Sequence, residues 1–442
     1  MNRLLVLAYF FPPLGGGGCQ RTLKLVRYLE PRGWAATVVT VKDPDYWILD
    51  PSLLEEVPPS CEILRVNALT SQRLLRLLGR AGFRVEERQG ARRAGMFRAL
   101  RRLQQAAAIP DGYRPWASAA RRAAAKRIER GGVGALWTTS SPESAHLAGL
   151  ALKRRFGLPW VADFRDPWVG RVTYAPPTAW HDRRHRALEA EVVAAADRVT
   201  MVSEAMADRY RARYPALAPG RFVVLPNGYD PDDWTRAAAL AAPHEEEARD
   251  RGRFVLLHAG QLAHRPTVGD LLEAARRLLA EKPSRRETLR LRFMGGNEGL
   301  DARAIERAGL ADIVELVPSR PHLEALAAMR RAGALVLLGH GGDADSLLYT
   351  GKIYEYLSSG RPVVAILEEG PAASLLRATG RGHACRPGDV ASVQAAIGAH
   401  LEAWESGGAS PGSPLTPLAR EWERADMAAK AAELLDGLLA AR

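Results

Sequence analysis

Cysteine is scarce in this chain of 442 residues, and long apolar runs are absent. The three cysteines, Cys19, Cys61 and Cys385, are scattered and odd in number. This pattern argues against a disulfide framework and fits a reducing compartment. No run of about 18 or more apolar residues occurs, so the sequence predicts no membrane-spanning helix. Met1–Ala8 is followed too soon by proline and glycine to form a signal peptide. We therefore expect a cytoplasmic protein.

Three familiar ligand motifs are missing or incomplete. Gly15–Gly18 are contiguous glycines rather than G-x-G-x-x-G, and no acidic residue ends the next predicted strand. A nicotinamide-dependent oxidoreductase is therefore disfavoured. His181 and His185 lack an evident third zinc ligand, so we interpret them as solvated helix surface. Asp230 and Asp232 imitate the D-x-D pair of some metal-dependent transferases, but they follow a Pro-Asn-Gly turn at a domain boundary, so we interpret them as capping residues of a linker.

Basic residues are in excess, with 62 Lys and Arg against 50 Asp and Glu and a net charge of +12. Residues 73–102 contain ten arginines and two glutamates, interleaved with leucine and phenylalanine. Such a segment suits an anionic membrane surface or a lipid substrate. A surface helical hairpin without a lipid partner is the alternative. We expect no nucleic-acid binding, because the segment has no Tyr, Trp or His for base stacking.

Apolar segments of strand length alternate with amphipathic helical segments in two halves of the chain. The predicted strands of the first half are Leu4–Phe10, Trp34–Val41, Ala135–Thr139, Trp160–Phe164, Arg198–Val202 and Phe222–Leu225. Those of the second half are Phe254–His258, Leu289–Met294, Ile313–Val317, Ala334–Leu338 and Val363–Ile366. This alternation predicts an α/β fold with two facing Rossmann-like domains, each built on a parallel sheet.

Several candidate site residues follow the ends of these strands. The glycine turn comes after the first strand, where doubly wound sheets bind ligands, and bare glycines let backbone N–H groups approach a phosphate. Arg165 and Asp166 follow another strand of the same half. Because the carboxyl ends of parallel strands share one edge, we expect this pair near the glycine turn. The pair either pins a loop through a salt bridge or orients an acceptor hydroxyl.

A helix predicted to open near Gly351 carries Lys352 and Glu355 on one face. A helix N-terminus with a lysine suits a phosphate, and a glutamate one turn on can accept hydrogen bonds from sugar hydroxyls. The alternative is an ordinary helix–strand corner with a solvated Lys–Glu pair.

Seven motifs occur in one order along nearly the whole chain. They read PPLGGGG, SSPESAHL, WVADFRDPW, ADRVTMVSE, LPNGYD, HAGQL and TGKIYEYLSSGRPVVA. Each is weak singly, but together they resemble the retaining glycosyltransferases of the GT-B fold, family 4. The resemblance implies transfer of a sugar from a UDP- or GDP-sugar to a glycan, glycolipid or related acceptor, as in the synthesis of cell-envelope polysaccharide. It implies no metal and no other cofactor. With the basic segment 73–102, we expect a peripheral location on the inner face of the plasma membrane.

The resemblance also implies roles for individual residues. Arg265 and Lys352 would neutralise the leaving diphosphate, and Glu355 would bind the donor ribose. The implied catalytic set is Arg265, Lys352, Arg165 and Asp166. The implied donor-binding set is Gly16, Gly17, Gly18, Arg21, Gly260, Thr350, Gly351 and Glu355.

By the same resemblance the chain divides into four parts. They are an acceptor domain at 1–225 with a basic helical insertion at about 70–105, a linker at 226–252, a sugar-nucleotide domain at 253–410, and a helix at 411–442 that returns to the first domain.

Two other functions stay open. Leu347 replaces the first glutamate of the family's E-x7-E pattern, and Arg165 stands where many members carry a histidine. Both departures favour a catalytically silent paralogue that binds a sugar nucleotide or lipid as an assembly partner. A nucleotide-sugar epimerase is the third possibility, although no acid–base set for it is evident.

Overall fold

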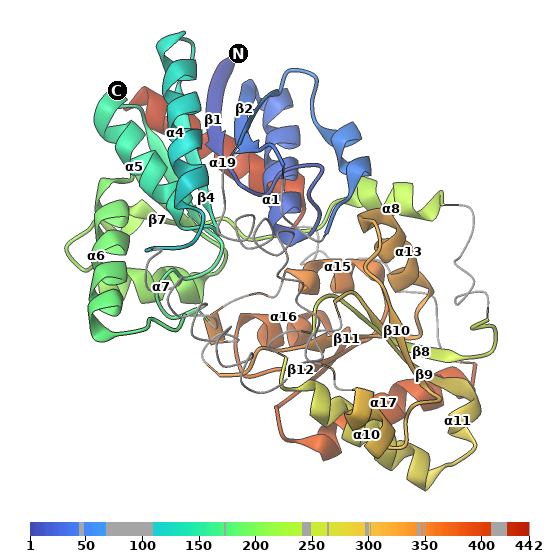
Figure 1. The fold of residues 1–442 in the computed structure, drawn as a ribbon. Helices are drawn as coiled ribbons and strands as arrows, with labels where there is room; N and C mark the ends of the chain where they lie inside the picture. The colour runs from blue at the N-terminus through green and yellow to red at the C-terminus, as the bar shows by residue number, and fades with distance from the viewer. Residues whose placement is uncertain are drawn as a thin grey trace, which may run out of the picture. The chain divides into compact units, whose positions relative to one another are not determined.

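The computed structural model describes residues 1–43, 48–67, 109–171, 174–240, 249–262, 265–296, 300, 302–342, 346–347, 349, 351–407 and 422–441 (Figure 1). The chain divides into two compact units. One unit comprises Met1–Leu225 and Ala428–Arg442, and the other comprises Pro226–Met427. The expected basic insertion at about 70–105 and the region just after the second predicted domain lie outside the described residues.

In the first unit, the described strands form one sheet of seven parallel strands in the order β3-β2-β1-β4-β5-β6-β7. The strands are β1 Asn2–Leu7, β2 Trp34–Val41, β3 Glu62–Val66, β4 Ala135–Ser140, β5 Trp160–Phe164, β6 Arg198–Met201 and β7 Phe222–Val224. All eight residues of β2 and all six of β4 are buried. Such continuous burial is typical of parallel strands covered on both faces.

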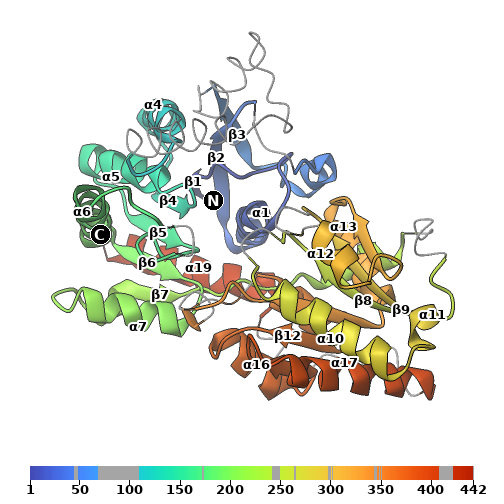
Figure 2. The same cartoon turned by 60° about the horizontal axis from the view of Figure 1, so that its bottom comes forward.

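Helices cover this sheet, and α4 and α5 lie side by side against it (Figure 2). The helices are α1 Gly17–Leu29, α4 Arg114–Glu129, α5 Ser144–Phe156, α6 Ala179–Ala195, α7 Glu204–Arg213 and the C-terminal α19 Arg424–Ala440, with short 3-10 turns at Glu30–Arg32, Pro51–Glu56 and Pro219–Arg221. The C-terminal helix packs on this first unit, where Trp34 Nε1 donates a hydrogen bond of 2.9 Å to Asp436.

In the second unit, the described strands form a parallel sheet in the order β10-β9-β8-β11-β12-β13. The strands are β8 Phe254–Ala259, β9 Leu289–Met294, β10 Val314–Val317, β11 Ala334–Leu338, β12 Val363–Ile366 and β13 Gly382–Cys385. The helices are α8 Pro231–Ala238, α10 Val268–Glu281, α11 Arg285–Thr288, α12 Ala302–Arg307, α13 His322–Arg331, α15 Lys352–Ser359, α16 Pro371–Thr379 and α17 Val390–Glu405. In Figure 1 the strands run between α13 and α15 on one side and α10 and α17 on the other.

Both sheets have a topological switch point, where the connections of neighbouring strands lead to opposite faces. It lies between β1 and β4 in the first unit and between β8 and β11 in the second. Ligands of open α/β sheets bind outside the carboxyl ends of the strands at this point. The fold therefore assigns one candidate binding edge to each unit.

The predicted α/β fold with two parallel sheets is confirmed. Strands β2, β5, β9, β11 and β12 begin and end at the predicted residues. β1 was predicted as Leu4–Phe10 but runs from Asn2 to Leu7. Asp230, interpreted as a capping residue of a linker, caps helix α8, because its carboxylate accepts a hydrogen bond from Asp232 N. The helix itself was not predicted.

Two strands were not predicted. β3 has half-buried residues throughout, so it lacks the apolar signal of its neighbours. β13 reads GHAC and contains no residue with strong strand propensity. It forms because its backbone pairs with β12, and a side chain at Gly382 would collide with Val363.

Candidate functional site

The glycine turn of the first unit leads directly into α1. Gly16 is the N-cap residue with φ 88°, a conformation that favours glycine, and no side chain caps the helix. Within the described chain, the N–H groups of Gly17 and Gly18 have no acceptor. Unpaired N–H groups at a helix N-terminus favour an anion or a hydroxyl oxygen. The turn therefore has the backbone donors that the sequence predicted.

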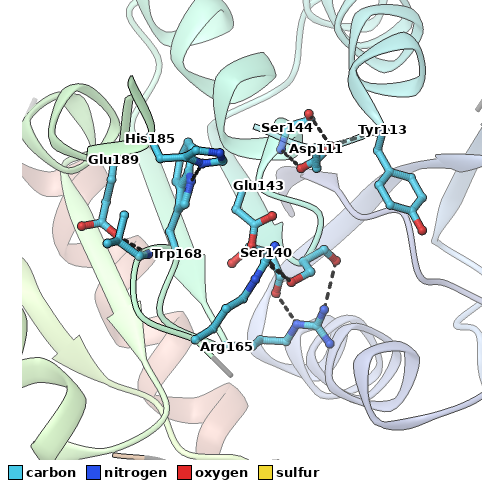
Figure 3. A network of polar contacts seen from close by, with 12 residues as sticks. Asp111, Tyr113, Ser140, Glu143, Ser144, Arg165, Trp168, His185 and Glu189 are labelled. Atoms are coloured by element: carbon cyan, nitrogen blue, oxygen red, sulfur yellow. Dashed lines mark hydrogen bonds and ion pairs between the residues drawn. The ribbon is translucent and has the colours of Figure 1, made fainter. Parts of the chain in front are cut away.

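Arg165 lies against this turn and against the end of β4. Figure 3 shows its hydrogen bond to Ser140. Its Nε donates to the carbonyl oxygen of Ser140, and its Nη2 donates to that of Ser141 over 3.0 Å. A Cβ atom added to Gly18 would collide with the Arg165 guanidinium. The predicted proximity of Arg165 to the glycine turn is thus present. Its side chain also covers the Phe10 ring at 5.9 Å.

The loop after β5, which carries this arginine, is anchored to α6 and α7. Trp168 N donates to Tyr210 Oη over 3.2 Å, and Val169 N donates to Glu189 over 3.0 Å. Trp168 Nε1 donates to His185 Nδ1 over 3.0 Å (Figure 3). Sequence reasoning missed Glu189 and Tyr210, because nothing in an amphipathic helix distinguishes a buried carboxylate that anchors a distant loop.

Arg21 does not have the predicted donor-binding role. The side chain is 2% exposed, and it donates to both carboxylate oxygens of Asp163, over 3.0 and 2.7 Å, and to Leu225 O. Thr139 and Thr200 also donate to Asp163. The guanidinium is therefore committed to an internal network, and we remove Arg21 from the donor-binding set.

Three carboxyl groups lie near the end of β4 (Figure 3 shows two of them, Glu143 and Asp111). Glu143 is 2% exposed and forms a close ion pair with Arg171. Burial raises the pKa of Glu143 to about 7, and the charges of Asp111 and Asp166 add to the effect against the opposing charge of Arg171. Asp111 accepts hydrogen bonds from Ser144 N and Oγ. No hydrogen bond of the Asp166 carboxylate occurs within the described chain, so it is open to a ligand hydroxyl.

Three histidines of this unit have individual roles. His146 is fully buried, its Nδ1 lies 2.7 Å from Thr138 Oγ1, and its ring stacks on Phe164. Burial lowers the pKa of His146 to about 3, so this imidazole is neutral at physiological pH. The prediction of solvated helix surface is wrong for His181, which is 8% exposed, and His185 is half-buried against the anchored loop. No group of three or more His, Cys, Asp or Glu that could hold a metal is present in the described chain.

At the switch point of the second unit, a glycine and two cations come together. Arg265 Nη1 donates to the carbonyl oxygen of Leu338 at the end of β11. A Cβ added to Gly260, just after β8, would lie 2.7 Å from Lys352 Cε. The structure therefore brings the predicted residues Gly260, Arg265 and Lys352 to one edge.

His258 lies beside these two positive charges at the same edge. Its Nδ1 donates to Val336 O over 3.0 Å. Burial lowers the pKa of His258 to about 4, and the charges of Arg265 and Lys352 contribute in the same direction. An anion placed here would offset the positive charges of Arg265 and Lys352, so the site suits a diphosphate.

Helix α15 positions the lysine. Gly351 is its N-cap residue and no side chain caps it, as predicted for a phosphate-binding helix end. Tyr356 Oη accepts a hydrogen bond of 2.9 Å from Ala259 N, which fixes the helix to the end of β8. Glu355 is half-buried, and its carboxylate makes no hydrogen bond to any described residue. Thr350 and the basic segment 73–102 lie outside the described residues, so their predicted roles stay predictions.

The glycine turn offers a matched pair of substitutions. A Cβ at Gly17 would meet nothing within 4 Å, whereas at Gly18 it would meet the Arg165 guanidinium. We expect Gly17→Ala to raise the free energy of unfolding by up to about 1 kcal/mol, because it restricts the unfolded chain. We expect Gly18→Ala to lower the free energy of unfolding by about 1–3 kcal/mol, because the new methyl group displaces the half-buried Arg165 guanidinium from its hydrogen bonds. Denaturant unfolding of the two variants measures the difference, and equal stabilities would contradict the described position of Arg165.

Family models match both parts of the chain. The model described as Glycosyltransferase Family 4 matches residues 72–233, and the one described as Glycosyl transferases group 1 matches residues 253–403. The chain is a family 4-like glycosyltransferase of the GT-B fold. The family resemblance that the seven motifs predicted is thus confirmed.

Two curated relatives of this chain are both named as D-inositol 3-phosphate glycosyltransferases. The chain is 32% identical over 184 residues to a D-inositol 3-phosphate glycosyltransferase of Geodermatophilus obscurus. This alignment covers 40% of the chain and 39% of the relative. The chain is 29% identical over 265 residues to D-inositol 3-phosphate glycosyltransferase 2 of Catenulispora acidiphila. This alignment covers 56% of the chain and 59% of the relative. The matches therefore span less than two thirds of either relative.

Solved structures of other proteins have the same fold as this chain. Anabaena HepE in complex with UDP-glucose aligns with a TM-score of 0.64 and 15% identity, over 98% of this chain and 99% of HepE. None of the described helices combines the length and the apolar character that a bilayer crossing requires.

Proposed function

We propose that this protein is a retaining glycosyltransferase that moves a sugar from a nucleoside diphosphate sugar to a glycan, glycolipid or related acceptor. The observation that carries the proposal is the convergence of Gly260, Arg265 and Lys352 at the switch point of the second unit. Two cations beside a bare backbone suit a diphosphate, and the family supplies the reaction type.

The chemistry follows from where charge develops. When the bond between the sugar and the diphosphate breaks, negative charge grows on the diphosphate and positive charge grows on the anomeric carbon. Lys352, Arg265 and the N-terminus of α15 stabilise the negative charge, and Glu355 binds the donor ribose. These fixed cations do the work that a metal ion does in other transferases, so we propose that the reaction needs no metal.

Retention needs no separate nucleophile from the protein in this proposal. The acceptor hydroxyl attacks the anomeric carbon from the face that the diphosphate leaves, and the departing phosphate oxygen takes the hydroxyl proton. In the first unit, Arg165 and Asp166 orient the acceptor, and the backbone N–H groups of the glycine turn Gly16–Gly18 bind the donor.

The relatives suggest which substrates to test. HepE was solved with UDP-glucose, so a UDP-sugar is the first donor candidate, with GDP-sugars next. The curated relatives are named for D-inositol 3-phosphate, which makes a polyol phosphate one acceptor to include beside glycans and glycolipids. We propose a peripheral position on the inner face of the plasma membrane through residues 73–102. Salt-sensitive flotation with anionic liposomes would support this contact, and its absence would argue against it.

The test is donor cleavage by the purified protein. We expect slow release of UDP or GDP from one sugar nucleotide in a panel, faster release when an acceptor is added, and no loss of rate in EDTA. A product with unchanged anomeric configuration would establish retention. Tight binding without turnover would instead favour the silent paralogue, which the buried Leu347 supports, since no carboxylate stands there. A free epimerised sugar nucleotide would favour the epimerase.

A further inference from the structure

Trp422 packs on two tyrosines at the start of α15. Its ring centroid lies 4.9 Å from that of Tyr349 and 4.7 Å from that of Tyr354, and the first pair meets edge to face. Tyr354 belongs to the first turn of α15 and is 2% exposed. Aromatic pairs at such distances contribute more than the area that they bury. Trp422 therefore holds the N-terminal turn of the helix.

A second tryptophan holds the other end of α15. Trp234 of α8 donates through its Nε1 to Ser358 Oγ over 2.9 Å. Tyr354 and Ser358 are four residues apart, so they lie on one face of the helix. Lys352 and Tyr356 are also four apart and lie on another face, against the end of β8. The helix is thus held between the two tryptophans and β8.

The two tryptophans come from the segments 226–234 and 422–427, which we call the anchor segments. They stand at the two ends of the second unit in the sequence. Tyr229 joins them, because its N–H donates to Trp422 O over 3.1 Å and its carbonyl oxygen accepts from Arg424 N over 2.9 Å. The anchor segments therefore support α15 as one paired element.

We infer that Trp422 is a positioning residue for the proposed transfer. It acts through Tyr354 and fixes the first turn of α15, so that Lys352 and Glu355 keep their places at the carboxyl edge of the sheet. The inference rests on the proposed function, which assigns the diphosphate to Lys352 and the ribose to Glu355. A misplacement of about 1 Å can slow a reaction by about 10²-fold, so a residue outside the site can control the rate.

The test compares Trp422→Leu with Trp404→Leu. Trp404 is the matched control, because it is partly buried in the same unit at the end of α17, and its ring lies 5.9 Å from that of Phe254 at the start of β8. We expect both variants to melt at lower temperature than the wild type. Only Trp422→Leu should slow single-turnover cleavage of the donor, by about 10-fold. Trp422→Phe keeps an aromatic ring and should restore most of the rate.

A double variant separates positioning from a general loss of stability. If Trp422 acts through the helix that carries Lys352, the effects of the two changes are not independent. We expect Trp422→Leu to slow the Lys352→Met protein by less than about twofold, because the charge that it positions is already gone. A full additional loss in that background would overturn the inference.

The affinity for a free nucleotide tests the inference without turnover. Titration calorimetry with UDP and GDP should show several-fold weaker binding to Trp422→Leu and wild-type binding to Trp404→Leu. A protein that binds a nucleotide but cleaves no sugar nucleotide would refute the proposed transfer, and weaker binding in Trp422→Leu alone would still support the positioning role. Equal rates and equal affinities in the two leucine variants would overturn it, as would a wild type that binds neither nucleotide.

Discussion

Replacing Lys352 by methionine is expected to slow cleavage of the donor by about 10²–10³-fold, the usual loss when one preorganised donor to a developing charge is removed. The lysine lies over Gly260 at the switch point, beside His258, whose pKa is lowered by burial and, to a smaller extent, by the charges of Arg265 and Lys352. Methionine keeps most of the stem that covers the glycine. The change is therefore confined to the charge, and single-turnover release of the nucleoside diphosphate measures its effect.

The control is Lys282→Met in the same unit. Lys282 is exposed at the end of α10 and pairs with Glu405 over 2.9 Å, away from the carboxyl edge. We expect wild-type rates from this control and wild-type circular dichroism from both variants, since Lys352 makes no hydrogen bond or ion pair to the described residues. A Lys352→Met rate close to that of the wild type would mean that the diphosphate is stabilised elsewhere.

Asp163→Asn is expected to lower the free energy of unfolding of the first unit by about 3–5 kcal/mol, because it leaves a buried guanidinium without its counter-charge. Asp163 is 1% exposed and Arg21 is 2% exposed, so water cannot replace the lost partner. Urea unfolding followed by a probe in this unit measures the loss. Asp208→Asn breaks a surface pair with Arg211 and should change the stability little.

The effect of Asp163→Asn should depend on pH. Burial alone would raise the pKa of Asp163, but the charge and hydrogen bonds of Arg21, with those of Thr200 and Thr139, outweigh burial and hold the pKa below its ordinary value of 3.8. The unfolded state therefore binds the proton at higher pH than the folded state. The stabilisation is fully present well above pH 3.8 and is lost as the pH falls through the lower folded pKa. The wild type and the variant should converge in acid, and a constant difference down to low pH would contradict the ion pair.

Sequence patterns located the parts of the fold that depend on local signals. Continuous apolar runs gave β2, β5, β9, β11 and β12 with correct bounds, since parallel strands buried on both faces have no polar alternation. β13 was not predicted, because its four residues acquire strand geometry only from pairing with β12. The shared edge of parallel strands was enough to predict Arg165 beside the glycine turn, whereas Gly260, Arg265 and Lys352 were assigned to one site by the family resemblance.

Long-range polar contacts were beyond the reach of the sequence. Arg21 looked like a ligand-binding residue because it follows the glycines, yet it pairs with Asp163, which stands far along the chain. Glu189 anchors a loop from another strand, and no spacing rule connects the two.

The C-terminal helix has a practical consequence for anyone dividing this protein. Helix α19 starts within the second unit at Arg424, while its later part, from Ala428, belongs to the first. Ala428, Ala431 and Leu435 are completely buried. A protein truncated after Leu225 would thus lack the apolar side chains of α19 that fill the core of the first unit. A circular permutation that joins 428–442 ahead of Met1 would keep them, and it is the sounder route to expressing that half alone.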